Sequence, residues 1–268
     1  MGSFPIVWHL GPLTLYAYGV GIALSFLFGA TYLVRRLERR GEPAEWVWSI
    51  LPWVLLAAIA GARLASVLAN AGAYAPDPLR AVDFLHGGLA GLSSFGGIAA
   101  AVPTALWLVH RRAPGLGLLR GLDLATPVLV ASWAVARLVA CQFMLAGGGP
   151  RTNAWYGLAY AGQAGRRIPV PLYQSAENWI IFALLLVLER WRDARGEPRG
   201  LLLAVGAGLW GLSRASDEWL FFFHPAHTGA LATAASGLAL FAVGMALGTW
   251  LLLRRSSERL VIGAGSAP

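Results

Sequence analysis

The sequence predicts an all-α integral membrane protein with seven transmembrane helices, its N-terminus outside and its C-terminus in the cytoplasm. Of the 268 residues, 57% are apolar and only 13% are charged, whereas about a quarter of residues are charged in an ordinary soluble domain. The apolar residues form long runs, and about 20 consecutive residues are enough for a helix to cross the bilayer core. We expect residues 1–268 to form a single transmembrane domain.

Seven segments are long and apolar enough to span a membrane. The expected spans are 12–34, 46–70, 93–110, 122–146, 171–189, 200–220 and 228–253. They leave two longer loops, 71–92 and 147–170, which are rich in Gly, Pro and aromatic residues. Because Trp and Tyr prefer the membrane–water interface, we expect these loops to lie on or partly within one leaflet.

The arginines predict the orientation, since all 21 basic residues of the chain are arginine. Fourteen of them flank the spans on one side and four lie on the other. Cytoplasmic loops carry the excess of basic residues. Both longer loops are therefore expected to face outward.

Several functional classes are disfavoured by composition. A net charge of +8 would indicate nucleic-acid binding in a soluble protein, but here the arginines alternate with apolar runs, so no nucleic-acid partner is expected. The single Cys141 excludes an intramolecular disulfide and a multi-cysteine metal site. His224 and His227 have no third ligand nearby, so neither a metal nor a cofactor is expected. The glycines of 206–211 match GxGxxG, but without a preceding strand they are better explained by helix packing.

Three arginines stand apart because they lie inside predicted spans: Arg63, Arg137 and Arg214. A guanidinium stays protonated and is unfavourable in hydrocarbon, so an intramembrane arginine marks a functional site by default. Three such charges predict a bound phosphate. Arg214 and Glu218 are one helical turn apart and can pair. Two interpretations stay open for this pair, a structural ion pair and a carboxylate that orients the arginine toward a phosphate. A structural partner is also the alternative for Arg63.

Histidine is the usual residue for proton transfer near neutral pH, and His86 is the candidate base among the histidines of this chain. It follows the first outward loop and precedes Gly87 and Gly88, which allow a ligand to approach the backbone closely.

The order of motifs resembles the prolipoprotein diacylglyceryl transferase family over essentially the whole chain. The matching stretches are Tyr18-Gly19, Gly61-Ala62-Arg63-Leu64, Gly91 to Ile98, Ala136-Arg137-Leu138 with Gly148 beyond it, Arg167 to Gln174 with Tyr173, and Arg214 with Glu218. No single stretch is specific, but together, in this order, they indicate the family's fold.

The resemblance implies an enzyme of the bacterial cytoplasmic (inner) membrane. Such an enzyme moves the diacylglyceryl group of phosphatidylglycerol, an anionic phospholipid, onto the cysteine thiol of a lipoprotein precursor and releases glycerol phosphate. It implies that Arg137 and Arg214 hold the phosphate and stabilise the leaving group, and that a histidine assists thiol deprotonation. The implied phospholipid-binding residues are Tyr18, Arg63, Arg137, Gly148, Tyr173, Arg214 and Glu218.

The sequence departs from the family pattern at positions where the family has residues that transfer protons or form hydrogen bonds. Phe95 stands in the position of the family's histidine, and a phenyl ring cannot accept a proton. Ala140 replaces an asparagine and Gln174 replaces a glutamate. His86 is the candidate replacement, since residues 86–91 are themselves close to the family's His-Gly-Gly-Leu-x-Gly, although its position along the span favours Phe95 as the equivalent residue.

These departures favour a divergent paralogue and leave several functions open. The first is the orthodox diacylglyceryl transferase, and the second is a homologue that acts on a different acceptor or lipid moiety. The third is a membrane protein that binds phospholipid without catalysis. A small-solute transporter is disfavoured, because seven spans give no even inverted repeat.

Overall fold

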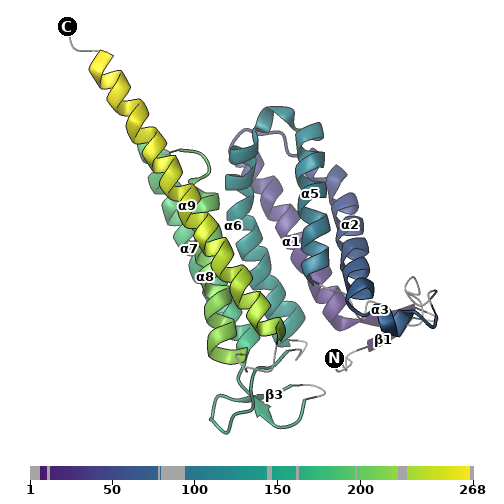
Figure 1. Ribbon diagram of the computed structural model, residues 1–268. Coiled ribbons are helices and arrows are strands. Elements are labelled where there is room, and N and C mark those ends of the chain that lie inside the picture. Colours follow the sequence, from purple (N-terminus) through teal and green to yellow (C-terminus); the bar gives the residue numbers. More distant parts are fainter. Residues whose placement is uncertain are drawn as a thin grey trace. The chain divides into compact units, whose positions relative to one another are not determined.

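The computed structural model is predominantly helical (Figure 1). It describes residues 7–10, 13–77, 79, 94–143, 147–160, 163–196, 198–222 and 228–265. The helices are α1 (Ala17–Arg39), α2 (Trp46–Ala69), α3 (Ala71–Tyr74), α5 (Ser94–Arg112), η2 (Pro114–Leu116), α6 (Leu118–Ala136), η3 (Arg137–Phe143), α7 (Val170–Arg195), α8 (Leu201–Asp217), η4 (Glu218–Phe222) and α9 (Thr228–Gly265). Two short antiparallel ribbons pair β1 (Val7–Leu10) with β2 (Leu13–Tyr16), and β3 (Leu158–Ala159) with β4 (Arg166–Arg167).

Each predicted span overlaps a long helix, namely α1, α2, α5, α6, α7, α8 or α9. In the described part of the chain, five helical segments are long and apolar enough to cross a membrane. These are Tyr18–Arg39, Trp46–Ala69, Leu118–Phe143, Val170–Arg195 and Thr233–Ser256. The molecule is therefore a helical protein with several helices that are long and apolar enough to span a membrane.

The predicted start of the first span was wrong. Residues 13–16 form strand β2 and pair with β1, with Val7 opposite Tyr16. The β-branched and aromatic residues of this segment favour a strand over a helix. At its other end α1 continues to Arg39, with Arg36 and Arg39 in the last turn, where positive charges interact favourably with the helix dipole.

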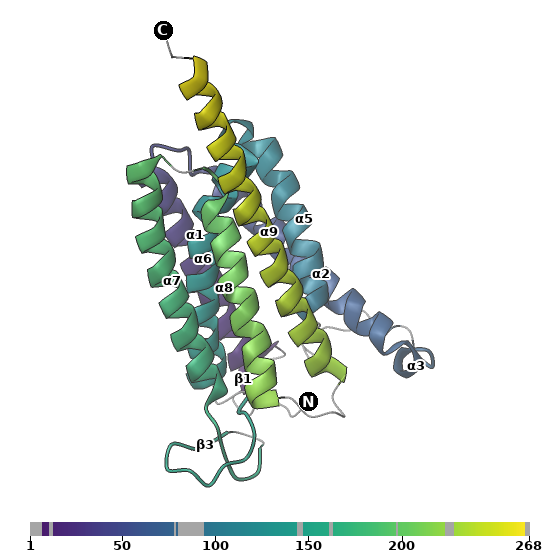
Figure 2. The ribbon, with the colours of Figure 1, turned by 60° about the vertical axis from the view of Figure 1, so that its left-hand side comes forward.

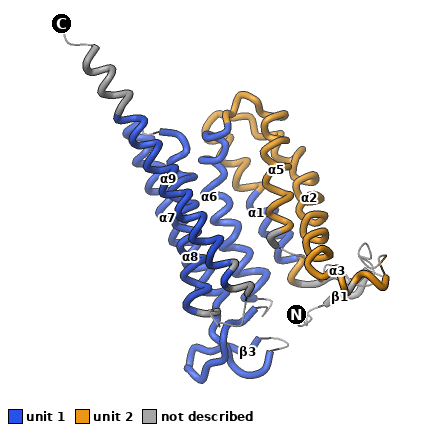
Figure 3. The backbone as a smooth tube through the Cα atoms, in the orientation of Figure 1, with its two compact units in different colours: residues 1–5, 20–29, 118–268 blue, residues 6–19, 30–117 orange. Residues whose placement is uncertain are grey.

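The chain divides into two compact units (Figure 3). Unit 1 contains residues 1–5, 20–29 and 118–268, and unit 2 contains residues 6–19 and 30–117. In unit 2, α2 and α5 pack through small residues. A Cβ added to either Gly61 or Gly96 would collide with the carbonyl oxygen of the other. Small residues at such crossings let helix backbones approach closely in a membrane.

In unit 1, α6, α7, α8 and α9 run side by side (Figures 1 and 2). A buried apolar cluster joins three of them and consists of Val130 from α6, Ile181 and Leu185 from α7, and Leu202 from α8. Because lipid tails are as apolar as these side chains, close packing rather than water exclusion holds such helices together.

The contact between α8 and α9 depends on glycine. A Cβ at Gly211 would meet the backbone of Gly237 and Phe241, and a Cβ at Gly237 would meet the backbone of Gly211. The prediction that the 206–211 glycines serve helix packing is confirmed for Gly211, and also for Gly206, where a Cβ would collide with the side chain of Thr126.

We expect Gly211→Ala to destabilise the protein by about 1–3 kcal/mol, because the rigid backbone of α9 leaves no room for the methyl group. Gly208→Ala is the matched control, since its Cβ would meet only Phe241 Cδ2 at 3.9 Å, an ordinary contact. Thermal unfolding in detergent measures both variants. Equal unfolding temperatures for the two would contradict this account of the α8–α9 contact.

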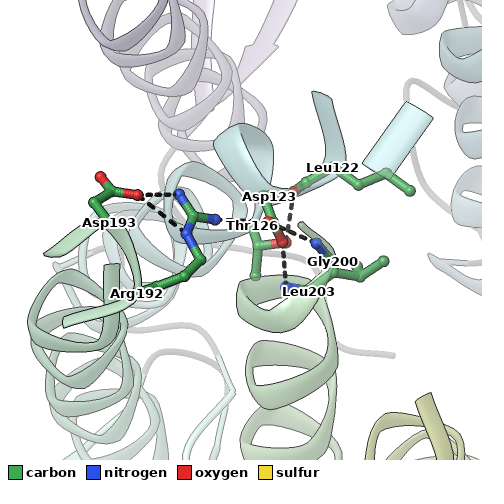
Figure 4. A network of polar contacts seen from close by, with 7 residues as sticks. All are labelled: Leu122, Asp123, Thr126, Arg192, Asp193, Gly200 and Leu203. Atoms are coloured by element: carbon green, nitrogen blue, oxygen red, sulfur yellow. Dashed lines mark hydrogen bonds and ion pairs between the residues drawn. The ribbon is translucent and has the colours of Figure 1, made fainter. Parts of the chain in front are cut away.

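A buried polar network fixes the beginning of α8 (Figure 4). The Asp123 carboxylate of α6 accepts hydrogen bonds from Arg192 Nη1 at 2.6 Å, from the Gly200 amide at 2.7 Å and from the Leu203 amide at 3.0 Å. The first amides of a helix have no partner within it. Asp123 thus caps α8 from a neighbouring helix and ties α6, α7 and α8 together.

Candidate functional site

Three helix ends meet at one end of unit 1. The carboxyl ends of α6 and α8 and the amino end of α7 lie beside the loop that carries β3 (Figures 1 and 2). Both α6 and α8 continue there as π-helices, η3 from Arg137 and η4 from Glu218. Single π-helical turns are rare and occur often at functional sites. Two residues singled out from the sequence, Arg137 and Glu218, therefore begin irregular helical segments.

Arg137 is a partly buried cation at the start of η3. Its guanidinium lies 4.9 Å from the ring centroid of Trp133, and its Nη1 is 3.6 Å from Cys141 Sγ. Its Nε atom is buried and has no hydrogen-bond partner within the described part of the chain. Among the described residues, no carboxylate lies within ion-pair distance of this guanidinium. A ring face and a thiol compensate a buried charge only weakly, so Arg137 has the properties of an anion-binding group.

Arg214 differs from Arg137 because two carboxylates already contact it. Its Nη1 donates to Asp217 Oδ2 at 3.1 Å, and its Nη2 donates to Glu218 Oε1 at 2.7 Å. The pairing of Arg214 with Glu218 expected from the sequence is therefore present. The additional pair with Asp217, whose side chain is only 2% exposed, fixes the guanidinium more tightly than one partner would.

Helix α7 adds two polar contacts to this cluster. Gln174 Nε2 donates to Asp217 Oδ2 at 2.8 Å, and Glu177 Oε2 accepts from Ser213 Oγ at 2.8 Å. A glutamate at position 174 would place a further carboxylate against Asp217, whereas glutamine donates to it. The glutamine that stands in place of the family's glutamate is therefore the suitable hydrogen-bond donor for the Asp217 carboxylate.

Hydrogen bonds join the described parts of the loop after η3, residues 147–160 and 163–169, to η3 and to one another. Tyr160 Oη donates to Gln142 Oε1 at 2.6 Å, and Arg167 Nη1 donates to the Gly149 carbonyl at 3.1 Å. Burial raises the pKa of the Tyr160 phenol, so Tyr160 stays protonated and donates at neutral pH. Gly148 lies against the Tyr160 ring, where any Cβ would collide. Close packing against the Tyr160 ring therefore requires a glycine at position 148.

The remaining predicted residues fall in three places. Tyr18 and Arg63 belong to unit 2, where the buried Arg63 lies 5.6 Å from the ring centroid of Tyr74. His86 lies outside the described residues, and Phe95 is described only by its backbone in the first turn of α5. Tyr173 lies in the first turn of α7. Ala140 in η3 is fully buried against Gly21 of α1, which explains a small residue there.

The sequence pattern described as prolipoprotein diacylglyceryl transferase matches residues 5–254 of this chain. The chain belongs to this family. The phosphatidylglycerol–prolipoprotein diacylglyceryl transferase of Parasynechococcus marenigrum is 30% identical over 273 residues, which cover 95% of each chain. The enzyme of the same name from Halalkalibacterium halodurans is 32% identical over 198 residues, 70% of this chain and 67% of the relative. That from Tolumonas auensis is 30% identical over 206 residues, 75% of this chain and 76% of the relative.

Membership of the prolipoprotein diacylglyceryl transferase family makes this protein a membrane protein of a transferase family. The resemblance expected from the sequence is therefore confirmed at the level of the family. The Arg137 and Arg214 motifs of the resemblance lie in the same unit, which also contains Gly148.

The sequence analysis did not identify Glu177 as a residue of this cluster. It also did not predict that Ser213 and Gln174 donate hydrogen bonds to the carboxylates of Glu177 and Asp217. One signal was available. Glu177 is a carboxylate inside an apolar span, three residues after Gln174 and four after Tyr173, so the three share a helix face. An ionisable residue in such a position marks a functional site as an intramembrane arginine does.

Proposed function

We propose that this protein transfers the diacylglyceryl group of phosphatidylglycerol to a cysteine thiol of a lipoprotein precursor and releases glycerol phosphate. The observation that carries the proposal is the guanidinium of Arg137, a partly buried cation in a membrane helix with no carboxylate partner among the described residues. A lipid phosphate supplies the missing negative charge. The names of the relatives support phosphatidylglycerol as the donor.

In this proposal Arg137 and Arg214 have unequal roles. Arg137 contacts the phosphate directly, because its planar guanidinium can donate two parallel hydrogen bonds to phosphate oxygens. Arg214 is held by Asp217 and Glu218 and adds positive potential from a fixed position. As the bond to the diacylglyceryl carbon breaks, negative charge grows on the departing phosphate, and preorganised donors stabilise that charge.

We also propose that the topology and the wider phospholipid site are those predicted from the sequence. The seven long helices each cross the bacterial cytoplasmic membrane within one transmembrane domain, with the N-terminus and the two longer loops outside. Tyr18, Arg63, Gly148 and Tyr173 contribute to phospholipid binding. His86 remains the sequence's candidate for the base that assists the thiol.

The test is incubation of the purified protein with phosphatidylglycerol and a lipobox peptide, followed by mass spectrometry of the peptide. The expected result is a peptide that is heavier by one diacylglyceryl group, with glycerol phosphate released in equal amount. A product on another nucleophile would support the divergent transferase instead. Bound phospholipid without any product would support a binding protein, the alternative that Phe95 favours because this position lacks a proton acceptor.

A further inference from the structure

The charge of Arg137 faces an aromatic ring. Its guanidinium carbon lies over Trp133, one helical turn earlier in the chain, at 4.9 Å from the ring centroid. Arg214, by contrast, donates Nη1 and Nη2 to Asp217 and Glu218. A carboxylate occupies the N–H groups that a phosphate needs, whereas a ring attracts the cation through its face and leaves those N–H groups available. The ring thus compensates the Arg137 charge without blocking a phosphate.

The Trp133 ring is held in place by a second helix. The rings of Trp133 and of Trp210 from α8 have centroids 5.6 Å apart and planes at 84°, the edge-to-face arrangement that aromatic pairs prefer. Trp210 lies one turn before Arg214 on α8, as Trp133 lies one turn before Arg137. The contact between the two tryptophans therefore fixes the ring beneath Arg137 against the helix that carries Arg214.

Another tryptophan–arginine pair of this chain has the same spacing but different surroundings. Arg195 lies over the Trp191 ring near the end of α7, also at 4.9 Å from the centroid. Both of these residues are exposed, whereas Arg137 and Trp133 are partly buried and the Arg137 Nε atom is fully covered. A cation–π contact contributes less in water than in a desolvated place. Burial therefore makes the Trp133 ring the more important of the two for its arginine.

We propose that Trp133 is a positioning residue for the phospholipid phosphate, because its ring holds the Arg137 guanidinium in the orientation that binds the phosphate. The inference rests on the proposed function, in which Arg137 contacts the phosphate directly. Trp133 acts through Arg137 and does not touch the reacting atoms. The contact of Arg137 Nη1 with Cys141 Sγ at 3.6 Å does not compete with this role, since a thiol is a weak acceptor and a phosphate oxygen is a strong one.

The decisive experiment replaces Trp133 by tryptophans that carry one, two or three fluorine atoms on the ring and keep its N–H group. Each fluorine withdraws electrons from the ring face and weakens its attraction for a cation. Arg137 then spends less time in the binding orientation, and the apparent affinity falls by the same fraction. Native mass spectrometry with added phosphatidylglycerol should show a stepwise fall in affinity of roughly 3–30-fold in total. Diacylglyceryl transfer to a lipobox peptide should fall in the same order.

The matched control places the same fluorinated residues at Trp191, where affinity and transfer should stay within about twofold of the wild type. The inference is overturned if fluorination at Trp133 leaves the affinity unchanged, or if fluorination at Trp191 lowers it equally. A loss of affinity in Trp133→Leu without any effect of fluorine also overturns it, because packing alone would then explain the loss. Fluorine-dependent lipid binding without any peptide product supports the role of Trp133 and overturns the proposed function.

Discussion

Arg137→Ala should abolish diacylglyceryl transfer, with a fall in turnover of at least about 10³-fold. Arginines that stabilise charge on a transferring or departing phosphate contribute effects of this size. Arg137→Lys keeps the charge but loses the paired donors and the stacking on Trp133, so an intermediate loss of roughly 10–100-fold is expected. Rates of peptide modification by mass spectrometry measure both variants.

The stability of Arg137→Ala separates a functional arginine from a structural one. Because the guanidinium has no carboxylate partner among the described residues, its removal should leave the unfolding temperature unchanged or raise it. Arg151→Ala is the matched control, since Arg151 is an exposed arginine of the neighbouring loop, and its turnover should stay within about twofold of the wild type. Transfer by Arg137→Ala within tenfold of the wild type would contradict the assignment.

Asp123→Ala should produce the largest loss of stability among single substitutions in unit 1. Asp123 is 3% exposed, and its removal leaves Arg192 Nη1 and the amides of Gly200 and Leu203 without their acceptor. Breaking a buried ion pair from one side costs about 3–5 kcal/mol. At roughly 2–4 °C per kcal/mol for a chain of this size, the unfolding temperature should fall by at least about 6 °C.

Asp193 provides the comparison for this prediction, because it binds the same arginine. Its carboxylate lies 2.8 Å from Arg192 Nη2, but its side chain is 40% exposed, and exposed ion pairs contribute about 0–1 kcal/mol. Asp193→Ala should therefore shift the unfolding temperature by no more than about 4 °C. If both substitutions lowered it equally, the cap that Asp123 provides to α8 would not be the source of the stability.

The long helices could be predicted because each rests on a local property, a long and mostly apolar run with arginines gathered near one end. Arg214 and Glu218 could be paired for the same reason, since one turn separates them. Strand β2 was missed because its residues are also apolar, and hydropathy does not distinguish a strand from the start of a helix. The π-helical continuation at Arg137 has no composition signal, so the sequence predicted the residue but not its backbone.

The contacts that sequence reasoning missed join residues far apart in the chain. Gln174 and Asp217 are separated by 43 positions and Arg192 and Asp123 by 69, and no periodicity links such pairs. The replacement at Gln174, taken alone, resembles a loss of function. Beside Asp217 it is a donor matched to a carboxylate, an explanation that required the packing of α7 against α8.

The most direct test of the phosphate site is native mass spectrometry of the purified protein, with wild type, Arg137→Ala and Arg151→Ala compared in the same detergent. The account predicts that the wild type and Arg151→Ala retain an anionic phospholipid through purification and that Arg137→Ala releases it. Equal retention of the same lipid by all three proteins would contradict the account, because the guanidinium of Arg137 would then not be what binds the phosphate.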